Sequence, residues 1–430
     1  MGSWERLDMR FDESSLYNIY SKLNGKRYPL YDLALWKNGL AFKKIHFSDA
    51  GVPVIKIAEL NNGISGNTSY TKQIFSDDVH LKKEDLLFSW SGNPQTSIDI
   101  FKFQLQEGWL NQHIFKVIPN EEIVDRDYFY FLMKYLKPWF TQIASNKQTT
   151  GLGHVTIADI KRMSVLVPSL TMQKKFVDVL KPINDKIQIN ASINNNLFEQ
   201  IKTIYTAWLS DYVPFGRVLP NDWSKISLST IAEFISGYSY KGSELKKSNI
   251  AMATIKNFDR NGGFKLEGYK EIVPSNKRKD TQYLNLFDTI VAHTDLTQNA
   301  EVIGNAEMIM SKSIYDDILF SMDLVKVIPK NKIISKFLIA AILQDKNFKA
   351  HCHGYINGTT VLHLSKKALS DYQIYLPNDF SVLNPLDELI AVLYQQIANN
   401  INETIELQSL RDILLPKLMS GELDVSKIKN

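Results

Sequence analysis

The hydrophobic and polar positions of the chain follow two patterns that alternate. From Tyr28 to Pro168, short apolar runs of strand length are separated by turn clusters, and the same texture returns from Trp223 to Pro377. Each stretch is followed by a long run whose apolar residues recur at steps of three and four, which is typical of a helix with a heptad seam. These runs extend from Leu170 to Leu209 and from about Pro385 to Leu418. The pattern predicts two mixed domains, each followed by a long helix.

The second half of the chain also repeats the first. The strand-like segment Phe115–Pro119 (FKVIP) returns as Val325–Pro329 (VKVIP), and His154–Pro168 returns as His363–Pro377 with the same internal spacing. One helix is expected after FKVIP, over 128–140, and one after VKVIP, over 334–343. The matched residues keep their order across half the chain, so each copy is a whole domain rather than a short solenoid repeat.

The two long helices are expected to pair with each other, because a lone helix of this length would expose its apolar seam. Internal symmetry favours an antiparallel pair with the two domains at opposite ends. At 1.5 Å per residue, a helix of some 40 residues would be roughly 60 Å long. Asn190, Asn194 and Asn400 lie at or beside the seam, where they would fix the register of the pair. The alternative is that they are ordinary surface asparagines.

The predicted fold is therefore α+β, with two similar globular domains separated by two long helices that form an antiparallel coiled coil. The expected parts are a helical lead-in over 1–28, a first domain over 29–168, a first long helix over 169–213, a second domain over 214–378, and a second long helix with the C-terminal tail over 379–430.

Composition narrows the class of protein only moderately. The chain has 430 residues, a net charge of +4 and one cysteine, Cys352. The single cysteine excludes an internal disulfide framework and fits a reducing cytosol. No apolar run reaches the roughly 18 residues of a membrane span, and the charged N-terminus has no signal-peptide core. We therefore expect a cytoplasmic protein with no membrane partner. The weak positive charge is compatible with nucleic-acid binding but does not require it.

The usual motifs of catalysis are missing from the sequence. It contains no phosphate-binding loop, no glycine fingerprint for a dinucleotide or S-adenosylmethionine, and no nucleophile elbow. The cluster of metal-ligand type, His351-Cys352-His353 followed by His363, lacks the paired spacing of structural zinc sites, so no metal is expected. The sequence predicts a protein that binds rather than catalyses.

Four passages carry a resemblance to a known family: LPNDWSKISLSTIAEFISGYSY (219–240), YPLYDLALWKNGLAF (28–42), TTGLGHVTIADIKRMSVLVPSLTMQKKF (149–176) and LRDILLPKLMSGELDV (410–425). The chain resembles the specificity subunit of type I restriction-modification enzymes over essentially its whole length. The second copy departs from the pattern, because NGTTVLHLSKKAL lacks the Gly-x-x-His spacing of the first domain exit and no glutamine matches Gln173.

The resemblance implies that each domain is a target recognition domain that reads one half of a split double-stranded DNA sequence. The helices would set the half-site spacing and dock two methyltransferase subunits and a restriction or motor subunit. The chain itself would be no enzyme and would hold no cofactor, since S-adenosylmethionine, ATP and Mg²⁺ would belong to the partner subunits. Two half-sites on one side of the duplex lie about 34 to 36 Å apart, a distance that such helices could span.

Polar loop residues at matching landmarks of both copies are the candidates for DNA contact, because base reading and phosphate contacts both need such side chains. In the first copy these are Lys37, Asn38, Lys43, Ser91, Asn93, Gln95, Thr96, Asn146, Lys147, Gln148 and Thr149. In the second they are Ser236, Tyr238, Tyr240, Lys241, His293, Thr294, Asp295, Thr297, Gln298, Asn299, Tyr355, Asn357, Thr359 and Thr360.

Among these residues, Gln148 and Gln298 are expected to read bases of one half-site each. Lys147 and Lys241 are expected to contact phosphates and so to strengthen binding to any sequence. Two other classes of protein stay open at this point: a coiled-coil scaffold that binds proteins without touching DNA, and an enzyme with an unrecognised active site. Steep salt dependence of duplex binding would distinguish the first alternative, and methyl transfer by the isolated chain the second.

Overall fold

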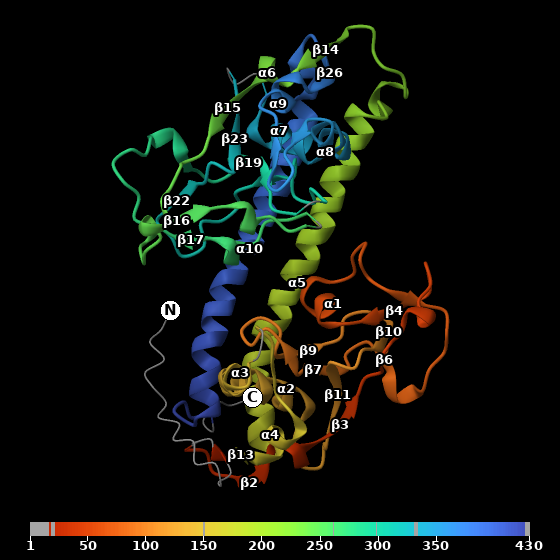
Figure 1. Ribbon diagram of the computed structural model, residues 1–430, viewed down its shortest axis with the longest axis vertical. Coiled ribbons are helices and arrows are strands. Elements are labelled where there is room, and N and C mark those ends of the chain that lie inside the picture. The colour runs from red at the N-terminus through yellow and green to blue at the C-terminus, as the bar shows by residue number, and fades with distance from the viewer. Residues whose placement is uncertain are drawn as a thin grey trace. The chain divides into compact units, whose positions relative to one another are not determined.

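The computed structural model describes residues 22–148, 151–260, 262–297, 299–330 and 334–425, together with the backbone of residues 17–18. It divides into two compact units, of which unit 1 is Met1–Asp185 with Gln408–Asn430 and unit 2 is Lys186–Leu407. Both divisions fall inside long helices, α5 (Leu170–Leu209) and α10 (Asn384–Met419), which are drawn in Figure 1. Each unit therefore contains one mixed domain and a segment of both helices.

Unit 1 is built from short strands and short helices. Its strands are β1 (Tyr17–Asn18), β2 (Lys26–Pro29), β3 (Ala34–Asn38), β4 (Val52–Ile55), β5 (Tyr70–Thr71), β6 (His80–Lys82), β7 (Leu86–Ser89), β8 (Ser91–Gly92), β9 (Asp99–Lys102), β10 (Glu107–Leu110), β11 (Ile114–Pro119), β12 (Gly153–His154) and β13 (Met163–Val167). Its shorter helices are α1 (Ile57–Asn62), α2 (Arg126–Tyr135), α3 (Lys137–Asn146) and α4 (Ile157–Arg162), with 3-10 turns at Leu30–Leu33, Lys44–His46 and Asp77–Val79.

Unit 2 contains the corresponding set. Its strands are β14 (Trp223–Ser227), β15 (Ala232–Ser236), β16 (Ile250–Ala253), β17 (Lys270–Glu271), β18 (Tyr283–Leu284), β19 (Thr289–Ala292), β20 (Thr294–Asp295), β21 (Ala306–Met308), β22 (Asp317–Phe320), β23 (Leu324–Pro329), β24 (Ile356–Asn357), β25 (Leu362–Leu364) and β26 (Gln373–Pro377). Its shorter helices are α6 (Leu228–Ile231), α7 (Lys336–Gln344), α8 (Lys346–His353) and α9 (Lys367–Asp371), with 3-10 turns at Val213–Phe215, Gly242–Glu244, Ile255–Asn257, Leu266–Gly268, Asp280–Gln282 and Phe380–Leu383.

The sheets of the two units repeat the same topology. The four-stranded order β3-β11-β7-β9 of unit 1 corresponds to β15-β23-β19-β21 of unit 2. The order β5-β4-β10-β6 likewise corresponds to β17-β16-β22-β18, and the pair β2-β13 corresponds to β14-β26. The repeat read from the sequence is therefore a repeat of complete domains, and the mixed fold class is confirmed.

The strand with the sequence KVIP is central in each domain, and its lysine makes the same ion pair in both copies. Lys116 Nζ lies 2.7 Å from Asp85 Oδ2 and donates to the carbonyl oxygen of His80 at 3.0 Å. Lys326 Nζ lies 3.4 Å from Asp288 Oδ2 and donates to the carbonyl oxygen of Tyr283 at 2.8 Å. The repeated lysine is thus part of the scaffold, where it ties a loop to the centre of the sheet.

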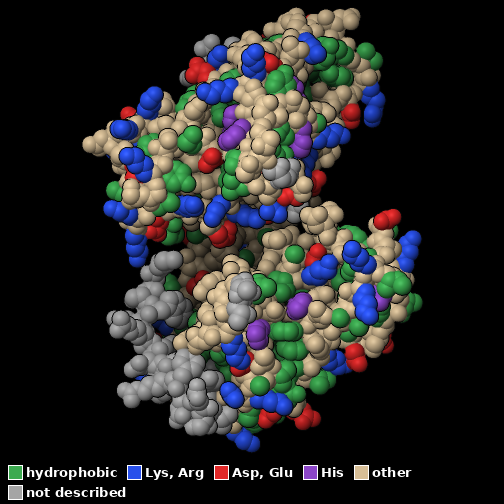
Figure 2. Space-filling model, in the orientation of Figure 1, with side chains coloured by type: hydrophobic (Ala, Val, Ile, Leu, Met, Phe, Trp, Pro, Cys, Tyr) green, Lys and Arg blue, Asp and Glu red, His purple; other side chains and the backbone are tan. Residues whose placement is uncertain are grey.

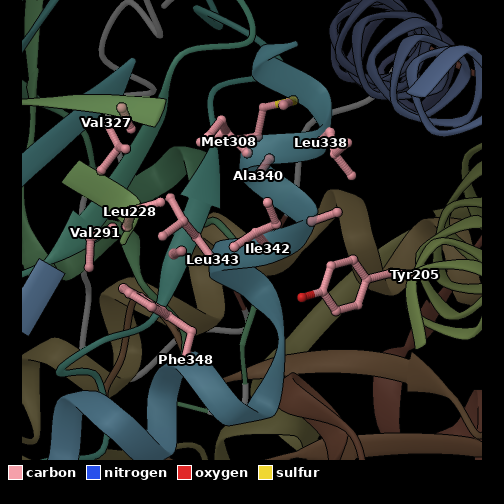
Figure 3. Packing of buried hydrophobic residues seen from close by; sticks show 14 of the residues in the cluster. Tyr205, Leu228, Val291, Met308, Val327, Leu338, Ala340, Ile342, Leu343 and Phe348 are labelled. Atoms are coloured by element: carbon pink, nitrogen blue, oxygen red, sulfur yellow. The ribbon is translucent and has the colours of Figure 1, made fainter. Parts of the chain in front are cut away.

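The core of unit 2 lies between its sheet, α7 and the helical segments of α5 and α10. Figure 3 shows Ile342 and Leu343 of α7 between the strand residue Val291 on one side and Tyr205 of α5 on the other. In unit 1, Phe176 of α5 and Leu418 of α10 belong to the core that also contains α2. Each mixed domain therefore packs on the apolar side chains of its own segments of the two long helices.

The paired helices of unit 2 contain a buried polar layer. Asn190 Nδ2 donates to Glu403 Oε2 at 2.8 Å, and Asn400 Nδ2 donates to Asn194 Oδ1 at 2.8 Å. The partner number falls as the number along α5 rises, so the helices run antiparallel, as predicted. The three asparagines are buried, which excludes the reading that they are ordinary surface residues. Such a layer favours one register, because a slip would leave buried polar groups unpaired.

Two local predictions are wrong. The helical lead-in over 1–28 is not helical where the structure describes it, because Tyr17–Asn18 and Lys26–Pro29 form β1 and β2 on either side of β13. Both edges of β13 offer unpaired backbone groups, and pairing them outweighs a local helical pattern. The helix expected over 128–140 is two helices that meet at Leu136, because Pro138 begins a new helix rather than continuing the first. Pro182, by contrast, lies inside the continuous helix α5.

Candidate nucleic-acid interface

Four segments of each domain meet at one end of the central sheet, where most of the polar loops also lie. We call this set loop edge 1 in unit 1 and loop edge 2 in unit 2. Loop edge 1 consists of residues 38–40, 89–92, 111–113 and 153–155. Loop edge 2 consists of residues 236–238, 292–295, 321–323 and 362–364.

Main-chain hydrogen bonds hold the segments of loop edge 1 in sequence. Gln112 N donates to the carbonyl oxygen of Leu40 at 3.0 Å, which joins the segment 111–113 to the segment 38–40. Trp90 N donates to the carbonyl oxygen of His113 at 3.3 Å, and Val155 N donates to that of Trp90 at 2.8 Å. These bonds join main-chain atoms only. The path of the backbone therefore does not depend on which side chains the edge carries.

Loop edge 2 repeats these bonds residue for residue. Met322 N donates to the carbonyl oxygen of Tyr238 at 3.0 Å, His293 N to that of Asp323 at 2.8 Å, and Leu364 N to that of His293 at 2.9 Å. His154 pairs with Ser91 between β12 and β8, and His363 pairs with Thr294 between β25 and β20. The edges thus share one backbone framework while most of their side chains differ.

A glycine at the first segment allows this framework to close. A Cβ atom on Gly39 would lie 2.1 Å from the carbonyl oxygen of Asn111, and one on Gly237 would lie 2.0 Å from that of Ser321. No Cβ atom can approach a backbone oxygen so closely. The glycines that sequence comparison matched are therefore required by the close approach of two segments.

The polar loops next to each edge are held by local bonds. Asn93 Oδ1 accepts from Gln95 N at 2.9 Å, and Thr141 Oγ1 donates to the carbonyl oxygen of Pro94 at 3.3 Å. In unit 2, Asp295 Oδ1 accepts from Thr297 N at 2.8 Å and Asp295 Oδ2 accepts from Val302 N at 2.9 Å. These bonds orient exposed residues such as Gln95, which carry hydrogen-bonding groups suited to base edges.

One histidine of loop edge 2, His293, lies near a second histidine and a lysine. His293 is half-buried, and burial lowers the pKa of its imidazole below the usual range. Electrostatic interactions with His363 and Lys366 lower that pKa further. Figure 2 shows His, Lys and Arg side chains at the surface of both units.

Comparison with known proteins places this framework in a family. The model of the type I restriction modification DNA specificity domain matches residues 24–199 and 220–407, which together are most of the chain. The chain belongs to this family. The resemblance found in the sequence is thereby confirmed.

Characterised members of the specificity-domain family match most of the chain at low identity. The HindI specificity subunit of Haemophilus influenzae is 22% identical over 403 residues, which cover 80% of this chain and 87% of the relative. The MjaVIII specificity subunit of Methanocaldococcus jannaschii is 22% identical over 390 residues and 87% of both chains. A crystal structure of the S subunit from M. genitalium superposes with a TM-score of 0.53 at 15% identity over 92% of this chain and 96% of that one, which shows a shared fold.

The structure places most residues predicted from the sequence on or beside the loop edges. Exposed or half-exposed in unit 1 are Lys37, Asn38, Lys43, Ser91, Asn93, Gln95, Thr96, Asn146, Lys147 and Gln148. In unit 2 the same holds for Ser236, Tyr240, Lys241, His293, Thr297, Asn299, Tyr355, Asn357, Thr359 and Thr360. Thr149 and Gln298 lie outside the described residues. Lys43 lies after the first segment, at the start of a 3-10 turn, and is not part of loop edge 1.

Three predicted contact residues are buried and are better described as supports. Tyr238 is 4% exposed, Thr294 6% and Asp295 3%, so none can reach a groove of DNA. The Tyr238 hydroxyl donates to Glu244 Oε1 at 2.6 Å, which helps to lower the pKa of Glu244 to about 2. Polar residue type suggested contact in the sequence, but the polar atoms of Tyr238 and Asp295 form hydrogen bonds with neighbouring groups of the fold.

Two predicted lysines are engaged by acids. Lys147 Nζ lies 2.6 Å from both carboxylate oxygens of Asp159, and Lys37 is paired with Asp78. Burial acts to raise the pKa of Asp159, but Lys147 and Thr156 outweigh it and hold that pKa below its usual range. Asp159 therefore competes with DNA for the charge of Lys147, and the expectation that Lys147 contacts phosphates stays a prediction.

Sequence reasoning missed the connection between β10 and β11, which carries Gln112 and His113, and the matching Met322 and Asp323. It also used His154 and His363 only to align the copies. The signal was present, because both connections immediately precede the KVIP strand. In the described part of the chain, no group of three or more His, Cys, Asp or Glu side chains is placed to hold a metal ion. None of the described helices has the length and apolar character that a membrane span needs.

Proposed function

We propose that the chain is the DNA sequence-recognition subunit of a type I restriction-modification system, in which loop edge 1 reads one half of a bipartite target and loop edge 2 reads the other. The observation that carries this proposal is the repetition of three main-chain hydrogen bonds under unlike side chains. One framework used twice presents two sets of donors and acceptors in the same geometry. Two different short sequences can be read in this way.

The exposed side chains suit base edges. Asn38, Gln95 and Thr96 in unit 1 offer amide and hydroxyl groups, which form hydrogen bonds with adenine and other bases in the major groove. Unit 2 offers Ser236, Asn299 and Asn357 in the neighbourhood of loop edge 2. Because the two sets differ in composition, the two half-sites are expected to differ in sequence.

Membership of the family supports a proposal for the remaining parts of the system. The subunit is not itself an enzyme; two methyltransferase subunits dock on the paired helices, and a restriction or motor subunit joins them. S-adenosylmethionine, ATP and Mg²⁺ are held by those partners, and the complex acts on chromosomal and invading DNA in the cytoplasm. The continuous helix α5 links the two domains and sets the spacing of the half-sites.

Sequencing of methylated bases tests the proposal. Cells that contain this chain and its methyltransferase subunits should carry modified adenines in one motif with two short specified parts and an unspecified spacer. The assembled complex should bind duplexes of that motif with an affinity that falls steeply with salt, because phosphate contacts release counterions. Absence of a methylated motif together with salt-independent binding would show that the chain is a protein scaffold instead.

A further inference from the structure

The middle segment of each loop edge is a short turn that immediately precedes the KVIP strand. We call residues 111–113 and 321–323 the central turns. Each is tied by main-chain bonds to the first polar segment on one side and to the second on the other, through Gln112 and His113 in unit 1 and through Met322 and Asp323 in unit 2. A central turn therefore occupies the middle of its loop edge, flanked by the polar loops.

The backbone of the central turns is fixed by the same surroundings in both copies. Leu40 forms an isolated parallel bridge with Asn111, and Tyr238 forms one with Ser321. Gly39 and Gly237 pack directly on the carbonyl oxygens of these two turn residues. A turn held in this way can change its side chains without changing its path.

The side chains of the central turns differ in chemistry and reach the surface. Gln112 is half-exposed and His113 is exposed, with 3.1 Å between Gln112 Nε2 and His113 Nε2, and the His113 ring lies 5.6 Å from the ring of Trp90. Met322 is 60% exposed although it is large and apolar. An exposed methionine side chain buries little apolar surface and so contributes little to the stability of the fold. Folding therefore does not explain why a methionine stands at this turn.

We infer that the central turns are specificity-determining elements, which read bases in the middle of each half-site. Gln112 has the amide geometry that pairs with the N6 and N7 positions of adenine, and His113 can donate to or accept from a base edge beside it. Met322 offers an apolar contact of the kind that recognises the methyl group of thymine. The inference rests on the proposed function, which supplies the DNA.

Methylated-motif sequencing of single variants tests the central turns. Gln112→Ala and His113→Ala should relax one base position in the half-site of unit 1, by about tenfold in discrimination, and leave the other half-site unchanged. Met322→Ala should do the same in the half-site of unit 2 only. The exchange Gln112→Met should replace one preferred base by another rather than abolish modification, because the turn backbone is retained.

Matched controls lie before β10 and β22, the strands that lead into the central turns. Gln104 and Ile314 are exposed residues of similar type, and Ile314 precedes β22 at the end away from Met322. Gln104→Ala and Ile314→Ala should leave both half-sites unchanged. Thermal unfolding of each complex shows whether a variant is folded. A bipartite wild-type motif that no folded central-turn variant alters would overturn the inference alone, whereas a wild type without such a motif would overturn the proposed function and the inference with it.

Discussion

The two loop edges have the same backbone and different side chains, and the comparison separates what holds a reading surface from what it reads. Gly39 and Gly237, Lys116 and Lys326, and the main-chain bonds at residues 90 and 293 recur because the framework needs them. Gln112 is replaced by Met322 and His113 by Asp323 at positions where the framework needs only a backbone. Residues that are the same in both copies hold the backbone of the loop edge in place. Residues that differ between the copies are the ones that we propose select a DNA sequence.

The largest effect is expected where a glycine allows two backbone segments to touch. Gly237→Ala would place a Cβ atom 2.0 Å from the Ser321 carbonyl oxygen, and Gly39→Ala would place one 2.1 Å from that of Asn111. Each substitution should cost about 4 kcal/mol or more, because the clash is with backbone and cannot relax cheaply. Thermal unfolding should show this loss, and methylated-motif sequencing should show loss of the half-site of the altered unit only.

Two other glycines provide the control for this prediction. A Cβ atom on Gly66 or Gly242 would meet no heavy atom within 4 Å. Gly66→Ala and Gly242→Ala should therefore change the unfolding temperature little. If they destabilise the protein as much as the loop-edge variants do, the close approach is not the reason for the glycines.

The second prediction compares the stability that is lost when the lysine of each buried ion pair is removed. The side chains of Lys326 and Asp288 are 6% and 14% exposed, whereas those of Lys116 and Asp85 are 14% and 22% exposed. Removing a lysine leaves a poorly hydrated carboxylate unpaired, which costs about 3–5 kcal/mol at a buried site. Lys326→Met should therefore lower the free energy of unfolding by about 3 kcal/mol, and Lys116→Met by less. Chemical denaturation would measure both losses.

A double variant separates the charge from the packing of the lysine. Adding Asp288→Asn to Lys326→Met should restore part of the lost stability, because the amide needs no counter-charge. Equal losses for the two lysines, or no recovery in the double variant, would contradict a role for burial of the charge.

The scaffold was readable from the sequence because scaffold residues repeat. The KVIP strands, the matched glycines and the seam asparagines all pointed to elements that the structure contains. The loop-edge residues were only partly readable, since residue type does not reveal burial. Thr294 and Asp295 appear as polar as Thr297, yet the antiparallel pairing of β20 with β25 buries the first two. The ion pair of Lys147 with Asp159 depends on how the loop after α3 meets α4, which no local pattern specifies.

A third prediction concerns a buried acid that is present in one copy only, Glu307. On the sheet of unit 2, Glu307 is the cross-strand neighbour of Ile290, which is the neighbour of Lys326. At the matching position of unit 1, the neighbour of Leu87 across from Lys116 is Phe101, which carries no charge. Burial raises the pKa of Glu307 from 4.5 to about 7, although the Gly263 N–H opposes this. Well below pH 4.5 the carboxyl is protonated in both the folded and the unfolded protein. As the pH rises toward about 7, the unfolded state alone gains from ionisation, so stability is lost over this window.

Glu307→Gln should remove that loss. The variant is expected to be more stable than the wild type at pH 8, by at most about 3 kcal/mol, and nearly equal to it below about pH 4. The amide oxygen can still accept from Gly263 N, which lies 2.7 Å from Glu307 Oε1. Thermal unfolding at both pH values would measure the difference, with exposed Glu267→Gln as the control. A constant difference at both pH values would show that ionisation is not its cause.

The smallest effect distinguishes two lysines that the sequence treats alike. Lys147 is held by both oxygens of Asp159, whereas no acidic side chain among the described residues pairs with the ammonium of exposed Lys241. A lysine contributes to the salt dependence of DNA binding only if its charge is available to displace a counterion. Lys241→Gln should therefore reduce the slope of log affinity against log salt by about one and weaken binding to all duplexes alike.

Lys147→Gln should leave the salt slope almost unchanged and act on stability instead, since it leaves the Asp159 carboxylate without its cation. Titrations of the assembled complex at several salt concentrations, with duplexes that contain or lack the methylated motif, would separate the two behaviours. Equal slopes for both variants would mean that the ion pair opens when DNA binds and that Asp159 restrains Lys147 only in the free protein. In that outcome Asp159→Asn should tighten binding to every duplex, because it would release the lysine before the DNA arrives.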